Sequence, residues 1–170
     1  MSLSVIVITR NAGATLKRCL ESVRWADEIV VLDSGSTDDT VAIAREYTGM
    51  VETTADWPGF GVQKNRALER AAGEWVLSLD ADEWVSAELR AEIETALARP
   101  GDPVAYRMPR LSSFCGRPIR HSGWWPDYVA RLFRRGHARF SDDLVHERLL
   151  PQGGVASLTN PLMHEAVEDV

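Results

Sequence analysis

Cysteine is scarce in this sequence: Cys19 and Cys115 are the only two among 170 residues. Two cysteines so far apart match no metal-binding spacing and build no disulfide framework, which excludes the small disulfide-rich and zinc-stabilised classes of protein. Cys19 falls on the apolar stripe of an expected helix, where it is most simply a small core residue. Such sparing use of cysteine fits a reducing compartment, so we expect a cytoplasmic protein.

Long hydrophobic runs are missing too. No segment approaches the roughly 20 apolar residues of a membrane-spanning helix, and neither repeats nor low-complexity tracts are visible. The chain enters a strand within a few residues of Met1, so we expect no signal peptide. With 45% hydrophobic residues, the chain suffices for one core and not for two. We therefore expect a single domain over residues 1–170, whose character changes after Pro103.

Strand and helix patterns alternate along the first half. Apolar runs predict strands at residues 4–9, 28–33, 50–53 and 75–80. Apolar residues at helical spacing predict helices at residues 16–23, 40–47, 62–72 and 86–99. Strands that alternate with helices in this way imply right-handed crossovers and a mostly parallel sheet, so the expected fold class is α/β.

Polar side chains stand at the ends of three of these strands. Thr9, Asp33 and Asp80 each occupy the C-terminal end of a predicted strand. In open α/β sheets, ligands bind in the crevice outside the carboxyl ends of the strands. Three separate strands that deliver polar groups to one edge predict a binding site at that edge.

The third of these strands belongs to the most informative stretch, Trp75 to Trp84, an apolar run that ends in Asp80 and Asp82. Two carboxylates held one residue apart repel each other, and a divalent cation that carries a phosphorylated ligand would compensate. The plainer interpretation is a loop that uses aspartate for turn geometry and helix capping.

The second half is basic and less regular. From Tyr106 to Arg148, nine arginines stand against four acidic residues, a balance of +5 in a chain of net charge −6. A basic face suggests an anionic partner, and local ion pairs are the alternative. Strands are expected at residues 104–110 and 129–133. The segment 160–165 is expected to enter a helix with no stop signal, which suggests a longer natural polypeptide.

Four ordered motifs of the first half resemble the family 2 glycosyltransferases of the GT-A fold. They are Val5–Asn11, Val30–Asp38, Lys64–Asn65 and Gly73–Asp82. The second half, with Asp127, Arg131–Phe133 and Val145–Glu147, resembles the branch that includes lipopolysaccharide core β-glucosyltransferases. The resemblance implies a nucleotide-sugar-binding half at residues 1–103, an irregular acceptor-side half at 104–170, and a mostly parallel central sheet flanked by helices.

The resemblance also implies roles around the donor. Thr9, Asn11 and Asp33 would line the nucleotide base and ribose, Lys64 would approach the base or diphosphate, and Asp80 would contact ribose or metal. A carboxylate suits the imide N–H of uracil and the ribose hydroxyls because it only accepts hydrogen bonds. The alternatives are a helix-capping turn for Asp33 and a solvated helix position for Lys64.

The same resemblance implies a metal centre. Asp82, with Asp80, would hold Mg²⁺ or Mn²⁺, since hard cations prefer oxygen ligands and bridge diphosphates. His164 would be an added ligand that favours Mn²⁺, with His146 as the other candidate. A lone histidine is more often a structural hydrogen-bonding group, and that interpretation stays open for His164.

An inverting transfer needs one general base for the acceptor hydroxyl. Glu147, in the Val-His-Glu motif, is our first candidate, Asp127 the second and Asp143 the third; the alternative for each is an ion pair with a nearby arginine.

Trp124, Trp125 and Tyr128 are predicted either to stack on an acceptor sugar or to pack in the core. Six arginines fit a phosphorylated glycolipid at the inner face of the membrane; they are Arg117, Arg120, Arg131, Arg134, Arg135 and Arg139. For Arg131, which alternates along a strand with two apolar residues, a structural role is the alternative.

These features predict an enzyme that moves a hexose from a nucleotide sugar of the UDP-glucose type to a bacterial glycolipid, such as the lipopolysaccharide inner core, and no nucleic-acid partner. Rival predictions are a glycosyltransferase acting on protein or another polysaccharide, a sugar-phosphate nucleotidyltransferase, and an inactive nucleotide-sugar-binding module. The nucleotidyltransferase prediction lacks support, because that class would place a glycine-rich loop with a basic residue just after the first strand. Gly13 is the only glycine of that loop here.

Overall fold

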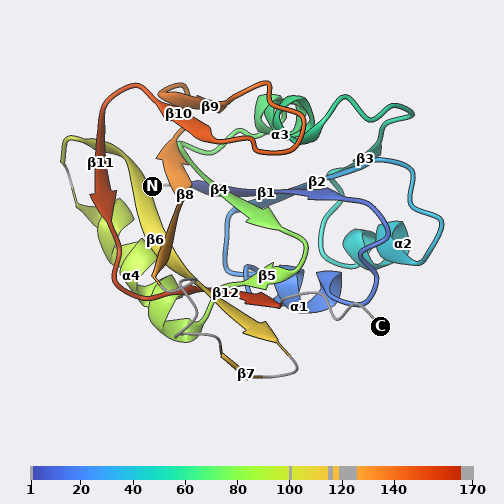
Figure 1. The fold of residues 1–170 in the computed structure, drawn as a ribbon, viewed down its shortest axis with the longest axis horizontal. Coiled ribbons are helices and arrows are strands. Elements are labelled where there is room, and N and C mark those ends of the chain that lie inside the picture. The colour runs from blue at the N-terminus through green and yellow to red at the C-terminus, as the bar shows by residue number, and fades with distance from the viewer. Residues whose placement is uncertain (1, 100, 115–116, 119–125, 166–170) are drawn as a thin grey trace.

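The computed structural model describes residues 2–99, 101–114, 117–118 and 126–165 (Figure 1). Strands and helices alternate through the first half, and strands dominate the second. The strands are β1 Leu3–Thr9, β2 Glu28–Asp33, β3 Val51–Thr53, β4 Trp75–Asp80, β5 Glu83–Trp84, β6 Pro103–Phe114, β7 Arg117–Pro118, β8 Asp127–Arg134, β9 Ala138–Phe140, β10 Leu149–Pro151, β11 Gly154–Ser157 and β12 Leu162–Glu165. The helices are α1 Leu16–Glu21, α2 Thr40–Arg45, α3 Phe60–Glu69 and α4 Ala87–Ala98.

One sheet joins both halves of the chain, in the order β3-β2-β1-β4-β8-β6-β12-β5. The strands of the first half, β1 to β4, pair in parallel. The strand β8 is antiparallel to both of its neighbours, β4 and β6, while β11 and β12 run parallel to β6. The fold class is therefore α/β as expected.

The register sets the polar strand ends side by side. Thr9 pairs with Asp33 across β1 and β2, and Ile8 pairs with Asp80 across β1 and β4. Parallel strands in register end at the same edge, so the three predicted polar ends share one rim of the sheet, as expected.

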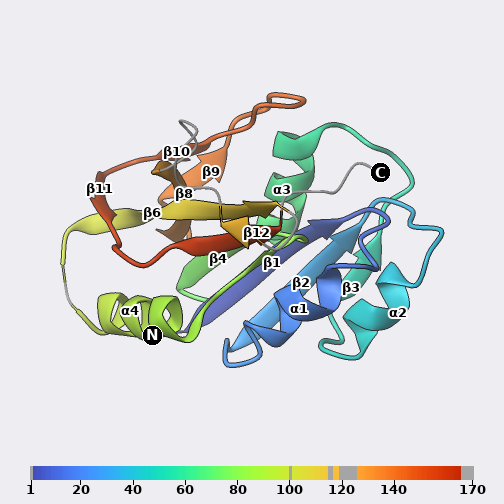
Figure 2. The same cartoon turned by 60° about the horizontal axis from the view of Figure 1, so that its bottom comes forward.

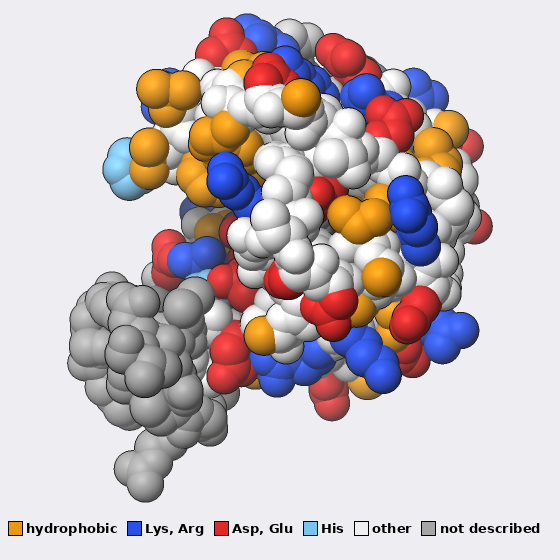
Figure 3. Space-filling view, turned by 90° about the vertical axis from the view of Figure 1, so that its right-hand side faces the viewer, with side chains coloured by type: hydrophobic (Ala, Val, Ile, Leu, Met, Phe, Trp, Pro, Cys, Tyr) orange, Lys and Arg blue, Asp and Glu red, His pale blue; other side chains and the backbone are white. Residues whose placement is uncertain are grey.

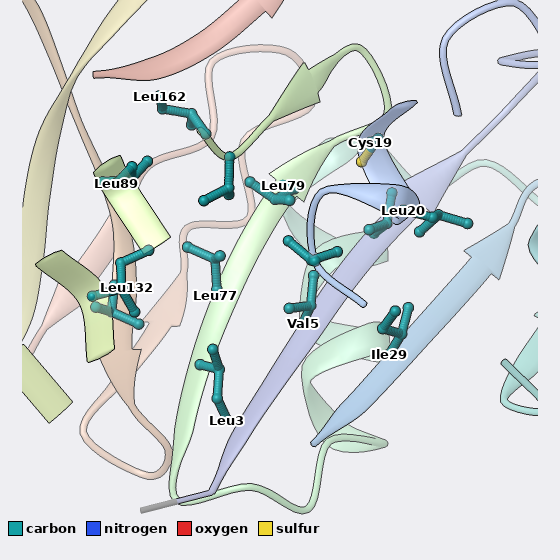
Figure 4. Close-up of a cluster of buried hydrophobic side chains, with 14 of the residues drawn as sticks. Leu3, Val5, Cys19, Leu20, Ile29, Leu77, Leu79, Leu89, Leu132 and Leu162 are labelled. Carbon is teal, nitrogen blue, oxygen red and sulfur yellow. The ribbon is translucent and has the colours of Figure 1, made fainter. Parts of the chain in front are cut away.

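Helices cover both faces of the sheet, with α1, α2 and α4 on one side and α3 on the other (Figure 2). Alternate residues of β1 divide between the two cores: Val5 and Val7 pack with the α1 and α4 side, and Ile6 packs with the α3 side. Figure 4 shows the larger cluster, in which leucines of β4 and β8 pack with side chains of the helices. Cys19 is buried in this cluster, which confirms its expected place in the core.

Some expected elements differ from those observed. The predicted helix over residues 160–165 is wrong, because Leu162–Glu165 forms β12, which pairs with β6 and with β5. A four-residue segment has little helical stability of its own, and a partner strand decides its conformation. The strand expected at 104–110 extends to Phe114, and α3 begins at Phe60, before the expected 62.

Among the described residues, no helix combines the length and the apolar character that crossing a bilayer requires.

Candidate active site

A pocket of about 630 Å³ opens at the rim where β1 and β4 end. Its lining includes four residues that the sequence singled out: Thr9, Asn11, Asp80 and Asp82. Ligand pockets commonly measure about 300–1,000 Å³, so a nucleotide sugar is within range. On the face towards which these strands point, acidic and basic side chains lie next to one another beside a hollow (Figure 3).

Asp33 lies behind the pocket wall. Its side chain is fully buried and accepts hydrogen bonds from the Thr9 hydroxyl at 2.8 Å and from the backbone N–H groups of Gly35 and Ser36 at 3.0 and 2.8 Å. These bonds form a turn within the loop after β2, as the alternative prediction for Asp33 required, but they cap no helix because α2 begins at Thr40 with Asp39 as its N-cap. The carboxylate therefore shapes the pocket through Thr9, which lies between it and the cavity.

Asn11 joins the two loops above the rim. Its backbone adopts a left-handed conformation with φ of 48°, which asparagine tolerates better than most residues. Its N–H donates to the Ser36 hydroxyl at 2.8 Å, and its side-chain oxygen accepts from the Thr37 N–H at 2.8 Å. The loops after β1 and β2 are thereby fixed to each other.

Asp80 is held between two cations. Its Oδ1 lies 3.3 Å from Lys64 Nζ, and its Oδ2 lies 3.3 Å from Arg131 Nη2. Burial by itself raises the pKa of this carboxyl, but the charges of Arg131 and Lys64 outweigh that effect and hold the pKa well below its usual range. Asp80 is therefore ionised at neutral pH, and both of its oxygens face protein cations.

The sequence did not single out Glu83, which completes this arrangement. Its side chain is fully buried, and Arg131 donates to its two oxygens at 2.5 and 3.1 Å. Glu83 also accepts from the Asp80 N–H at 2.8 Å, so it supports the backbone of the aspartate as well. Burial raises the pKa of Glu83, and the nearby charge of Asp80 adds to the rise, although Arg131 opposes it. Arg131 itself is only 8% exposed, which agrees with its structural alternative.

Asp82 lies beside His164, because β12 pairs with β5 directly after the two aspartates. The Nε2 atom of His164 is 3.1 Å from Asp82 Oδ2, and its Nδ1 atom is 2.9 Å from the Ser112 hydroxyl. Within the part of the chain that the structure describes, no group of three or more His, Cys, Asp or Glu side chains is arranged to hold a metal. A carboxylate and an imidazole nevertheless fit a divalent cation whose other positions are filled by diphosphate oxygens and water.

Glu147 reaches the same region from the loop between β9 and β10. Lys64 Nζ donates to Glu147 Oε1 at 2.5 Å and lies 3.3 Å from Asp80 Oδ1. Lys64 is 4% exposed, so the prediction of a solvated helix residue is wrong. One ammonium group therefore joins the first aspartate of the pocket to the first candidate base.

The loop that carries Glu147 is packed against the first turn of α3. The N–H groups of Phe60 and Gly61 donate to the carbonyls of Leu144 and Asp143 at 3.1 and 3.3 Å. Asn65 exchanges two hydrogen bonds of 2.9 Å with the backbone of Phe140, which fixes β9 to the same helix. The Lys64–Asn65 motif thus holds this loop from two neighbouring positions.

Gly61→Ala is expected to push the loop away from α3, because an added Cβ would lie 1.7 Å from the Ser141 carbonyl oxygen. We expect the free energy of unfolding to fall by about 1–3 kcal/mol, the usual cost of overpacking, in a denaturant titration. Gly49→Ala, where nothing lies within 4 Å of the added Cβ, is the control. An unchanged midpoint for Gly61→Ala would contradict the close packing.

The remaining candidates lie outside this cluster. Asp127 is exposed at the start of β8, 3.7 Å from Arg110, and Asp143 accepts from the Ser141 hydroxyl. His146 is exposed. Trp124, Trp125, Arg120 and the side chain of Arg117 lie outside the described residues. Tyr128 is 45% exposed, and Arg107 lies over its ring.

Many arginines of the second half have partners within the chain. Arg134 lies over the Trp75 ring, and Arg135 donates to the Gly73 carbonyl at 2.8 Å. Arg131 is buried with Glu83, while Arg139 is exposed. Contacts within the chain therefore engage three of these four arginines, and one of them, Arg131, has the ion pair that the alternative predicted.

Cys19 is expected to resist thiol reagents. Burial, and then the charges of Glu83, Asp80 and Asp82, raise the pKa of its thiol well above the usual value. Since the thiolate is the reactive form, Ellman's reagent at pH 8 should not modify Cys19 in a folded Cys115→Ser variant. Full modification is expected in denaturant, and prompt reaction of the folded protein would contradict the burial.

The fold and the pocket define the class of protein. A mostly parallel sheet, with paired aspartates at the end of a central strand beside a pocket, is the arrangement of the GT-A fold. The chain belongs to glycosyltransferase family 2, whose family model, "Glycosyl transferase family 2", matches residues 4–149.

Two curated relatives show the range of similarity. The chain is 34% identical over 180 residues to the lipopolysaccharide core biosynthesis glycosyltransferase LpsC of Rhizobium meliloti. The match covers 96% of this chain and 63% of LpsC. It is 42% identical over 145 residues to an uncharacterized glycosyltransferase, RP128, of Rickettsia prowazekii, covering 84% of this chain and 49% of the relative. The chain therefore spans less than two thirds of the length of these relatives.

Solved structures share the fold. TarS residues 1–349 of S. aureus, in complex with UDP-GlcNAc, superposes with a TM-score of 0.73 at 20% identity, covering 100% of this chain and 60% of that chain. Glucosyl-3-phosphoglycerate synthase of Mycobacterium tuberculosis, in complex with Mg²⁺ and UDP, gives a TM-score of 0.60 at 18% identity, covering 98% and 72%.

Proposed function

We propose that this chain is the donor-binding part of a metal-dependent, inverting glycosyltransferase that uses a nucleotide sugar of the UDP-glucose type. The observation that carries the proposal is the pairing of Asp82 with His164 at the rim of a pocket that Asp80 also lines. An oxygen and a nitrogen ligand beside a cavity of this size suit a cation with a nucleoside diphosphate.

In this proposal the first half of the chain binds the nucleotide. Thr9 and Asn11 line the pocket at the base and ribose, with Asp33 supporting Thr9 from behind. Asp80 would contact the ribose, because it lines the same pocket. These groups would orient the donor without themselves changing protonation.

Asp82 and His164 would hold Mg²⁺ or Mn²⁺. The bound cation would offset the negative charge that develops on the departing diphosphate. Ser112 touches the other nitrogen of His164 and would fix the orientation of the ring.

Glu147 is the general base in this mechanism. Its carboxylate would take the proton of the acceptor hydroxyl while the acceptor oxygen bonds to the anomeric carbon. The bond from that carbon to the diphosphate breaks with its electron pair on the leaving diphosphate. A single displacement of this kind inverts the configuration at the anomeric carbon.

For the acceptor we propose a bacterial glycolipid of the lipopolysaccharide inner-core type, at the cytoplasmic face of the membrane. The similarity to LpsC over 96% of this chain supports that choice over a protein acceptor. Exposed arginines such as Arg139 would contact its phosphate groups.

The test is a transfer assay with UDP-glucose, UDP-GlcNAc and GDP-mannose in turn, with Mn²⁺, and with truncated lipopolysaccharide core as acceptor. We expect UDP release from UDP-glucose that EDTA abolishes and that the acceptor accelerates well above the slow release with water. Turnover that persists in EDTA, or preference for GDP-mannose, would overturn the proposal.

A further inference from the structure

We propose that Lys64 is the positioning residue of Glu147, so that one ammonium group sets the place of the general base relative to the donor pocket. This inference rests on the proposed function, because it takes Glu147 to be the base. It assigns Lys64 to the reacting side of the site, in place of the donor contact that the sequence suggested.

Burial and distance carry the assignment. The side chain of Lys64 is 5% exposed, and that of Glu147 is 15% exposed, so little solvent screens the pair. The Glu147 contact, at 2.5 Å, is shorter than the 3.3 Å contact with Asp80. The centre of the Phe140 ring lies 5.5 Å from the ammonium group.

The rest of the loop is anchored without Lys64. Backbone bonds from Phe60 and Gly61 hold its middle, and Ser141 bonds to both the N–H and the carbonyl of Arg148, which closes the loop. These contacts place the backbone of the loop. Within the part of the chain that the structure describes, Lys64 alone bonds to the Glu147 carboxylate and fixes where it points.

Charge explains why the position requires a cation. The carboxylates of Asp80 and Glu147 both lie within ion-pair distance of Lys64 Nζ, and two carboxylates so close to each other repel. An ammonium group between the two removes the repulsion and keeps Glu147 next to the pocket. An ammonium group has three donors, and Asp80 and Glu147 take two of them, which leaves little capacity for a diphosphate.

The experiment compares four proteins: wild type, Lys64→Met, Glu147→Gln and the double variant. Two quantities are measured, the release of UDP from UDP-glucose with water as acceptor, and the affinity for UDP in Mn²⁺ by calorimetry. Arg66→Met is the matched control, because Arg66 lies on the same helix and pairs with the exposed Asp56. Lys64→Gln replaces Lys64→Met if the methionine variant does not fold.

We expect Lys64→Met to slow UDP release by at least about 10-fold, while the UDP affinity stays within about 3-fold of wild type. In the Glu147→Gln background the same substitution should have no further effect, because residues that act as a unit are not additive. Arg66→Met should match wild type.

Two results would overturn the inference. Equal losses from Lys64→Met in both backgrounds would mean that Lys64 does not act through Glu147. A loss of UDP affinity of about 10-fold or more would make Lys64 a donor ligand.

The same measurements distinguish a failure of the proposed function from a failure of this inference. If wild type releases UDP and Glu147→Gln does so equally fast, the base assignment is wrong, whatever Lys64 does. If wild type neither binds UDP nor releases it, the Glu147 side chain is followed by NMR of its ¹³C-labelled carboxylate. Lys64→Met should then shift the Glu147 carboxylate resonance and Arg66→Met should not; an unshifted resonance in Lys64→Met would overturn the positioning role.

Discussion

Glu147→Gln is expected to transfer glycosyl groups about 100 to 10,000 times more slowly than the wild-type chain, with the affinity for UDP unchanged. The amide keeps the shape of the side chain and its contact with Lys64, but it cannot accept the proton of the acceptor. General-base catalysis contributes a factor of this size. The measurements are kcat in the transfer assay and the dissociation constant for UDP.

Asp127→Asn and Asp143→Asn are the comparisons for this prediction, because both were candidates for the base. Asp127 is exposed and pairs with Arg110 at 3.7 Å, and Asp143 bonds to a neighbour in its own loop. We expect both variants to keep kcat within about 3-fold of wild type. A large loss at Asp127, with little change at Glu147, would move the base to the start of β8.

Arg131→Met is expected to lower the free energy of unfolding by about 3–5 kcal/mol. The substitution leaves Glu83 fully buried with its main counter-charge removed, and breaking a buried ion pair by deleting one partner costs this much. Denaturant titration measures the loss.

The matched control is Arg90→Met, which removes an exposed ion pair with Glu94 one turn along α4 and should cost less than about 0.5 kcal/mol. The double variant Glu83→Leu with Arg131→Met should recover part of the lost stability, because apolar residues can replace a buried pair. A loss below about 1 kcal/mol for Arg131→Met would contradict the buried pair.

The strands of the first half and the site edge were predictable because they follow from local patterns. The apolar runs that end at Thr9, Asp33 and Asp80 fix strand lengths, and parallel pairing then places the three ends together. The contact of Asp82 with His164 fits both the metal ligand and the structural hydrogen-bonding group predicted for the histidine, so its metal role stays a prediction. The sheet position of β12, by contrast, depends on pairing with β6, which no local pattern encodes.

The charge network was harder to predict because its contacts span the chain. Glu83 lies 48 positions from Arg131, and Lys64 lies 83 positions from Glu147. Nothing in the composition around Lys64 separates a buried lysine from a solvated one, since its helix also carries exposed charges. The signal available in the sequence was an acidic residue directly after the two aspartates, together with an arginine alternating with apolar residues in a strand.

The central claim is that Asp82 belongs to a site for a divalent cation and a nucleoside diphosphate. The most direct test is calorimetric titration of UDP into the wild-type chain and into Asp82→Ala, first with Mn²⁺ and then with EDTA, with Asp142→Ala as an exposed acidic control. We expect wild type and Asp142→Ala to bind UDP in Mn²⁺, and we expect EDTA or Asp82→Ala to weaken this binding at least about 10-fold. Binding that is indifferent to both EDTA and the Asp82 substitution would contradict it.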